Sequence, residues 1–249
     1  MKAVFRSFTI ENFSKPGDNL SSFITGITVE YSDDAGSQSE KYVVKLNPQK
    51  SAQQVSELIS LQFKQEVNFL NFTVPTLNSL LEEQNQLPLR VPEIVHYDST
   101  DGREVIFLKD IRKKGFVLTD RLNTLDKNHV KLVIKEYGRI HAASRLLFGK
   151  YPEKTIEKFK LNEHPLSHKG PADIIRGGIK DSIDTCMEFC KHPRFNLFAR
   201  TCCQKTLATE RLRNIDENIK QVVNFVHDDT SPFLAIIHHD CWFNNYMFR

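Results

Sequence analysis

Residues 236–249 read Ile-Ile-His-His-Asp-Cys-Trp-Phe-Asn-Asn-Tyr-Met-Phe-Arg, an apolar run that stops abruptly at two histidines and an aspartate. Charge directly after an apolar strand indicates a functional loop, and the apolar and aromatic flanks would hold its polar groups in place. Asp240 supplies a carboxylate that can accept the proton of a hydroxyl group, and Asn245 supplies an amide oxygen that can bind Mg²⁺. These residue types favour phosphoryl transfer, and an ordinary capped turn is the alternative.

The same run resembles the His-Gly-Asp-x-Trp-x-Asn-Asn-x-Met-Phe signature of the insect ecdysteroid kinase-like family, also called the CHK kinase-like family. This family is part of the aminoglycoside phosphotransferase and choline kinase group of the protein-kinase-like fold. One position departs from the signature, because His239 stands where Gly is usual. The resemblance implies a kinase that uses ATP and Mg²⁺, with Asp240 as the catalytic base and Asn245 as a metal ligand. It also implies a hydroxylated small molecule as the acceptor, such as an ecdysteroid or a related steroid or xenobiotic.

The chain stops before one further motif of the family's pattern. A second metal-binding aspartate, in an Asp-Phe-Gln type motif, is expected about twenty residues after the catalytic loop, and the sequence ends at Arg249. We therefore interpret the sequence as C-terminally truncated, which leaves open whether the chain as given is active. The alternative function is a catalytically dead fragment, or a noncatalytic protein that binds a nucleotide or a small molecule.

Length and composition disfavour several classes of protein. With 249 residues, of which 40% are hydrophobic, the chain can bury a substantial core. Its net charge of +3 comes from interspersed acidic and basic residues, which disfavours a nucleic-acid partner. The first residues form no signal-peptide core and no apolar run is long enough to span a membrane, so we expect a cytoplasmic protein without membrane contact. The composition does not indicate an oligomeric state.

Metal chemistry other than that of Mg²⁺ is disfavoured. The five cysteines include no Cys-x-x-Cys pair, so reduced and buried thiols are a better interpretation than a zinc site. A metallohydrolase that uses His238, His239 and Asp240 is also disfavoured, because adjacent histidines on a strand point to opposite faces.

A lysine on an apolar strand, Lys45, is the next candidate site residue. Alternating residues over 23–31 and 41–46 predict the two strands of a hairpin, and Lys45 projects from the second strand. A lysine that extends along the surface until its ammonium group reaches water is the alternative.

Glu66 provides Lys45 with a partner. A capping box at Ser51 begins a predicted helix that runs to about Asn71 and places Glu66 on the same stripe as the apolar residues. A carboxylate on that stripe needs a cation, and Lys45 lies on the strand directly before the helix. The predicted pair resembles the strand lysine and helix glutamate with which kinase-like folds orient ATP phosphates, so both residues are assigned to cofactor binding.

Two more segments are assigned to nucleotide binding. Ser21 and Ser22 end a polar stretch that occupies the place of a phosphate-covering loop, where their hydroxyl and backbone groups can donate hydrogen bonds. An ordinary turn is the alternative there. A second predicted hairpin over 91–108 leads to Lys109 and Asp110, which resemble the family's interlobe linker, whose backbone binds adenine.

The rest of the chain is expected to be mostly helical. Helical spacing predicts a helix from Asp126 to near Gly149, with His141 beside its apolar stripe as a residue that supports the catalytic loop. The remaining predictions are a loop-rich insertion over 151–178 and helices over 179–191 and 195–225.

Strands with one helix, followed by mostly helices, predict an α+β fold of two lobes. The resemblance identifies this fold as the protein-kinase-like one. We expect a β-rich nucleotide-binding lobe over 1–111 and a mostly helical, incomplete lobe with the catalytic and substrate residues over 112–249.

Overall fold

The computed structural model describes the chain in segments. The described residues are 3–13, 21–50, 52–120, 123, 125–151, 159, 165, 168–191, 214, 217, 235–238 and 245–249. The chain forms two compact units, of which the first comprises Met1–Lys50, Ile59–Leu161 and Phe233–Arg249, and the second comprises Ser51–Leu58 and Asn162–Pro232. The lobe boundary near Ile111 stays a prediction.

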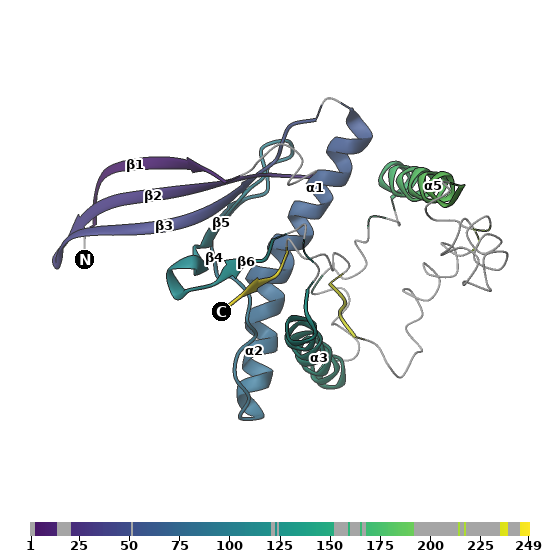
Figure 1. Cartoon of the computed structure of the whole chain (residues 1–249). Coiled ribbons are helices and arrows are strands. Elements are labelled where there is room, and N and C mark those ends of the chain that lie inside the picture. Colours follow the sequence, from purple (N-terminus) through teal and green to yellow (C-terminus); the bar gives the residue numbers. More distant parts are fainter. Residues whose placement is uncertain are drawn as a thin grey trace. The chain divides into compact units, whose positions relative to one another are not determined.

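The first unit contains a five-stranded antiparallel sheet in the order β1-β2-β3-β5-β4 (Figure 1). Its strands are β1 (Val4–Asn12), β2 (Phe23–Asp33), β3 (Gly36–Leu46), β4 (Ile94–Asp98) and β5 (Val105–Lys109). Both hairpins that the alternating residues predicted are present, as β2 with β3 and as β4 with β5. Together with the helices, this sheet confirms the α+β fold class.

The β2–β3 hairpin is longer than the sequence predicted. The Asp33 carboxylate accepts a hydrogen bond from the Ala35 amide at 2.8 Å, and Gly36 adopts a φ of 106°. Such a φ favours glycine and allows the chain to reverse tightly at this point. The second strand therefore begins at Gly36, and polar residues that the prediction placed in the turn continue the ladder, as in the pair Ser32 and Ser37.

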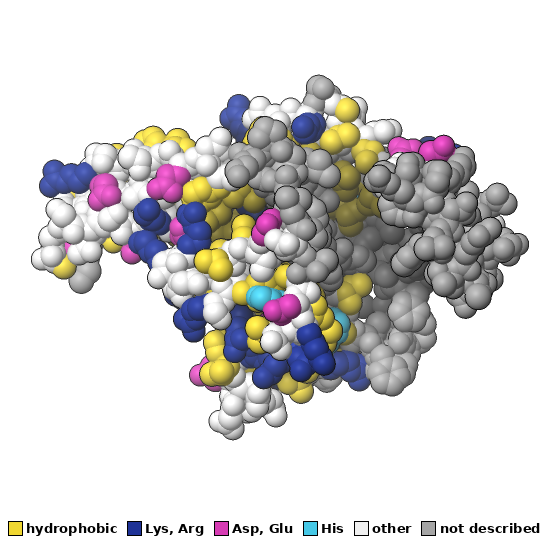
Figure 2. Space-filling view, viewed as in Figure 1, with side chains coloured by type: hydrophobic (Ala, Val, Ile, Leu, Met, Phe, Trp, Pro, Cys, Tyr) yellow, Lys and Arg dark blue, Asp and Glu magenta, His cyan; other side chains and the backbone are white. Residues whose placement is uncertain are grey.

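Strand β1 is an element that the sequence prediction did not name. Its nine residues are all exposed, and it forms one edge of the sheet. Figure 2 shows apolar side chains at the surface over this part of the sheet, and the exposed apolar residues of β1 are Val4, Phe5, Phe8 and Ile10. A strand without a buried face lacks the clear apolar alternation that predicts strands.

One helical rod follows the hairpin. It consists of α1 (Gln53–Asn68), a π-helical turn (Phe69–Thr73) and α2 (Val74–Glu83). The prediction ended the helix near Asn71, whereas the rod continues through the wider turn. Pro75 has no N–H with which to continue the regular helical hydrogen bonds, which explains a locally wider turn directly before it.

Helix α3 (Lys127–Lys150) agrees with the predicted helix from Asp126 to near Gly149. The Asp126 carboxylate caps it by accepting hydrogen bonds from the amides of Asn128 and His129. α3 packs against α2 and against Ile236, which precedes the predicted catalytic loop, and this core contains Leu77, Leu80, Leu81, Leu89, Ile140, Ala143, Leu147, Phe159 and Ile236. A two-stranded sheet joins β6 (Val117–Leu118) to β7 (Met247–Phe248).

In the second unit the structure describes α5 (Lys169–Lys191) and the first turns of α1. The prediction treated 151–178 as loop-rich, so α5 begins earlier than expected. That prediction rested on the abundance of Pro, His, Lys and Glu and on the lack of sustained periodicity, but proline is tolerated in the first turn of a helix and a single glycine only weakens one. The predicted helix over 195–225 lies outside the described residues, except for Asn214 and Glu217. Among the described helices, none combines the length and the apolar character that crossing a bilayer requires.

Candidate active site

Lys45 and Glu66 form the ion pair that the sequence predicted. The Nζ atom of Lys45 lies 2.6 Å from Oε1 of Glu66. β3 places Lys45 opposite Ile106 of β5, and α1 presents Glu66 between the buried residues Phe63 and Val67. The Lys45 and Glu66 side chains are 24% and 34% exposed, so the pair is shielded by protein but still open to a ligand. An ammonium group held in this way can donate hydrogen bonds to an anion such as a phosphate.

The strand register shows what lies beside Lys45. Ile24 is opposite Lys45, and Gly26 is opposite Val43. Because side chains alternate along a strand, Val43 and Lys45 point to the same face and lie about 7 Å apart along it. Lys45 therefore has an apolar and partly glycine-lined surface on the side that leads toward Val43.

A buried polar pair occupies the other side of Lys45. Glu104, which is 1% exposed, accepts a hydrogen bond from the side-chain amide of Asn47 at 2.6 Å, and its carbonyl accepts one from the Asn47 backbone. Its second oxygen, Oε1, is buried and has no hydrogen-bond partner within the part of the chain that the structure describes. The sequence analysis did not single out Glu104, although a glutamate directly before an apolar strand was a visible signal. The pair therefore lies beyond Lys45 at the end of β3, whereas Val43 lies on the opposite side of Lys45 along the strand.

An aromatic ring and a guanidinium group border that apolar side. The ring of Phe13 lies over Gly26 so closely that a Cβ at Gly26 would overlap its tip. The Arg112 guanidinium lies 3.9 Å from the centre of the same ring. Sequence analysis missed both residues, because a lone phenylalanine and a lone arginine have no local pattern that shows such a stack.

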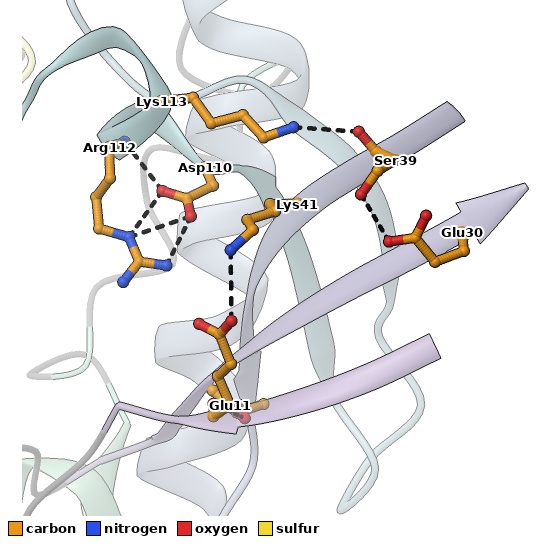
Figure 3. A network of polar contacts seen from close by, with 8 residues as sticks. Glu11, Glu30, Ser39, Lys41, Asp110, Arg112 and Lys113 are labelled. Carbon is orange, nitrogen blue, oxygen red and sulfur yellow. Dashed lines mark hydrogen bonds and ion pairs between the residues drawn. The ribbon is translucent and has the colours of Figure 1, made fainter. Parts of the chain in front are cut away.

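The side chains of Asp110 and Lys109 have partners of their own. The Arg112 guanidinium group binds the Asp110 carboxylate, with 2.6 Å between Nη2 and Oδ2 (Figure 3). The Asp110 side chain is only 2% exposed. The hydrogen bond from Arg112 keeps the pKa of Asp110 below its ordinary value. Lys109 pairs with Glu93 at 2.8 Å and is half exposed. The backbone amide of Asp110 donates to the carbonyl of Lys41, so the linker is fixed to β3.

Further polar contacts fix the short 3-10 helix Ile111–Lys114 to the sheet. Lys113 donates to the backbone carbonyl of Ser39 at 3.3 Å, and Lys41 pairs with Glu11 of β1 at 3.4 Å (Figure 3). The linker, β1 and β3 are therefore connected by one network of charged groups.

Ser21 and Ser22 lie directly before β2, at the end of the sheet that carries Lys45. Ile24 is opposite Lys45 in the register, and Ser22 is two positions before Ile24. Ser22 and Lys45 are therefore about 7 Å apart along the strand direction. The rest of the predicted phosphate loop, residues 15–20, lies outside the described residues.

Asp240 lies outside the described residues, whereas both flanks of its loop are described. Before the loop, the Ile236 amide donates to the hydroxyl of the buried Ser144 on α3 at 3.1 Å. After the loop, Asn245 is exposed and Tyr246 meets Tyr137 of α3, with 2.5 Å between the two hydroxyl oxygens. The described residues before and after the predicted catalytic loop thus both contact one helix, α3.

The prediction that His141 supports the catalytic loop by a hydrogen bond stays a prediction. Its ring lies 6.4 Å from that of Tyr137 in a stacked arrangement, and its carbonyl accepts the Ser144 hydroxyl. Observed contacts to the loop's flanks come from Tyr137 and Ser144, which the sequence indicated only as members of the helical stripe, and from His129. The described residues contain no group of three His, Cys, Asp or Glu side chains that could hold a metal ion.

The model of the family described as the Ecdysteroid kinase-like family matches residues 16–249, a range that includes Lys45, Glu66, Asp240 and Asn245. No curated protein and no solved structure matches the chain.

Proposed function

Because the chain belongs to the ecdysteroid kinase-like family, we propose that it transfers the γ-phosphoryl group of ATP to a hydroxyl group of a small molecule. Membership in the family indicates a kinase-like phosphotransferase of small molecules and implies the use of ATP. The single observation that carries the proposal to this chain is the ion pair of Lys45 and Glu66, at 2.6 Å.

This pair suits the phosphates of a nucleotide. The Glu66 carboxylate fixes the direction of the Lys45 ammonium group, and partial burial strengthens its attraction for a negative charge relative to bulk water. An unpaired lysine on the same strand would spread over many rotamers and lose conformational entropy on binding. Lys45 would orient the phosphates, and Glu66 would hold Lys45.

The rest of the nucleotide would extend over Val43. A base that lies there would meet the rim formed by Phe13 and Arg112. The amides of Lys109 and Asp110 already donate to the carbonyls of Glu93 and Lys41, so the linker would offer the base its carbonyl groups. The side chains of Lys109 and Asp110 are engaged by Glu93 and Arg112, which favours a backbone role for this linker.

The phosphate end would lie nearer to Ser21 and Ser22. Their hydroxyl and backbone groups would donate to phosphate oxygens from the end of the sheet that carries Lys45.

Asp240 and Asn245 would carry the chemistry. Asp240 would accept the proton of the substrate hydroxyl, which raises the nucleophilicity of the oxygen as it attacks. Asn245 would bind Mg²⁺, and the exposed position of this amide and the hard character of its oxygen fit that ion, which keeps several waters and needs few protein ligands. Bound MgATP supplies the transferable phosphoryl group and neutralises its negative charge.

The acceptor that we propose is a hydroxylated small molecule, with ecdysteroids and related steroids or xenobiotics as the first class to test. We propose neither a nucleic acid nor a membrane as a partner. A cytoplasmic location would give the protein access to ATP.

The test is transfer of labelled phosphate from ATP to a panel of steroids and plant toxins, compared between the wild-type chain and two variants. Asp240→Asn should bind nucleotide as the wild type does while turnover falls by orders of magnitude. Asp34→Asn, which changes an exposed carboxylate in the β2–β3 turn, should leave both quantities unchanged. Wild-type turnover in Asp240→Asn would remove this residue from its role. Nucleotide binding without transfer to any acceptor would favour the noncatalytic binding protein.

A further inference from the structure

Tyr137 of α3 touches both flanks of the catalytic loop. Its ring lies 5.8 Å from the ring of His238, which precedes Asp240, in an edge-on arrangement. Its hydroxyl oxygen lies 2.5 Å from that of Tyr246, which follows Asn245. Tyr137 therefore contacts one residue on each side of the loop.

Two other residues of α3 hold the same chain farther from the loop. Ser144, about two helical turns after Tyr137, accepts the Ile236 amide at 3.1 Å. His129, about two turns before Tyr137, places its ring 4.5 Å from that of Phe248. The incoming and outgoing segments therefore run along one helix and converge at Tyr137.

Helix α3 is a firm support for these contacts. Ala143 and Leu147 are fully buried against the helical core, and Ile140 is nearly so. Close packing of this kind restricts side-chain motion and keeps Tyr137 in one place.

We propose that Tyr137 is a positioning residue for the metal site, and this rests on the proposed function. Its hydroxyl group fixes Tyr246 relative to His238 and thereby sets the direction of the neighbouring Asn245. Asn245 directly precedes Tyr246, so a change in the position of Tyr246 is transmitted to Asn245 through the backbone. Tyr137 does not touch the nucleotide or the acceptor.

The experiment measures ADP affinity as a function of Mg²⁺ concentration, together with the melting temperature of the ligand-free protein. Tyr137→Phe removes the hydroxyl group but keeps the ring contact with His238. We expect the Mg²⁺ concentration at half-maximal effect to rise about three- to tenfold, the change that loss of one hydrogen bond produces. ADP affinity without Mg²⁺ should stay unchanged, because Lys45 and Glu66 are untouched.

A double-mutant cycle separates positioning from general destabilisation. Tyr246→Phe should raise the Mg²⁺ requirement as much as Tyr137→Phe does, and the double variant should be no worse than either single variant. Tyr97→Phe removes the same atom from β4 and should change nothing. A wild-type Mg²⁺ requirement in Tyr137→Phe, or additive effects in the double variant, would overturn the inference alone. A wild-type chain whose ADP affinity does not respond to Mg²⁺ would overturn the proposed function and this inference together.

Discussion

At the scale of single residues, the partial exposure of Lys45 and Glu66 determines what the pair can contribute. Ion pairs that water reaches add little to folding, about 0.2–1 kcal/mol in typical cases. The same pair can contribute much more to binding, because a phosphate that enters the site displaces water and meets an ammonium group already in place. Its main effect should therefore appear in ligand affinity.

We expect Glu66→Gln to lower ATP affinity by about tenfold, which corresponds to about 1.4 kcal/mol, because the Lys45 ammonium group loses the carboxylate that directs it. The free energy of unfolding should change by about 0–1 kcal/mol only. Calorimetric titration and urea unfolding measure the two quantities. The matched control is Glu83→Gln, which breaks the exposed pair with Lys150 at 2.7 Å and should leave ATP affinity unchanged. Equal losses of affinity in both variants would contradict the prediction.

The pair of Asp110 and Arg112 differs because the carboxylate is buried. Arg112→Gln should destabilise the protein at pH 7 by about 1–3 kcal/mol, the cost of leaving a buried acceptor without its partner. The exposure of Arg112, at 42%, places the effect in the lower part of that range.

The pH dependence of this effect follows from the lowered pKa of Asp110, for which the hydrogen bond from Arg112 is the main cause. The unfolded chain takes up the proton first, so the stabilisation is complete above the ordinary carboxyl pKa of 3.8. It is lost as the pH falls through the lower pKa of the folded state. The stability difference between wild type and Arg112→Gln should be constant from pH 5 to 7 and shrink below about pH 4. Arg176→Gln, in an exposed pair on α5, is the control, and a difference that persists at pH 2 would contradict this origin.

At the scale of helices and strands, the sequence predicted those elements whose local signals agree with their packing. The β2–β3 hairpin and α3 have regular apolar spacing and polar ends, as at Asp126. β1 was not predicted because its residues are exposed on both faces of the strand. β6 and β7 were not predicted because strands of two residues are too short to show a periodic pattern. The early start of α5 was missed because residues 151–178 are rich in Pro, His, Lys and Glu and lack sustained apolar periodicity, although proline is tolerated in the first turn of a helix.

The corrected start of α5 can be tested with one substitution. Gly178→Ala should raise the free energy of unfolding by about 0.5–1 kcal/mol, because alanine loses less backbone entropy in a helix and nothing lies near its Cβ. Gly36→Ala has the same open surroundings but a φ of 106°, so it should destabilise by about 1 kcal/mol or more. Urea unfolding of both variants provides the measurement. A neutral or negative effect of Gly178→Ala would place this residue outside a helix.

At the scale of the whole molecule, the candidate residues that the structure describes all belong to the first compact unit. Sequence analysis found Lys45, Glu66 and Asn245 because a charged or amide residue among apolar neighbours is conspicuous in a linear pattern. Phe13, Glu104 and Tyr137 could not be found in that way. Their significance depends on partners far along the chain, which only folding brings next to them.

Ligand binding should therefore protect the first unit. At a hundred times the dissociation constant, MgADP should stabilise the native state by about 2.7 kcal/mol through mass action. We expect slower amide hydrogen exchange in β3, in β5 and in α3, measured by mass spectrometry with and without ligand. Exchange in α5, which belongs to the second unit, serves as the internal reference. Protection confined to α5 would contradict the proposed placement of the nucleotide.

Strand β1 would govern the behaviour of the protein at high concentration. β1 is an edge strand that exposes Phe5, Phe8 and Ile10, so strands of other copies can pair with it. Arg6 is the charged residue that interrupts this apolar series. Salt weakens the repulsion between the Arg6 side chains of two copies. At 0.1 M salt, this repulsion is largely screened at separations beyond about 10 Å. Light scattering should therefore show that added sodium chloride lowers the solubility limit, and Ile10→Lys should raise that limit because it adds a repelling charge and removes an exposed apolar side chain. Low ionic strength would then be the condition that keeps the chain colloidally stable.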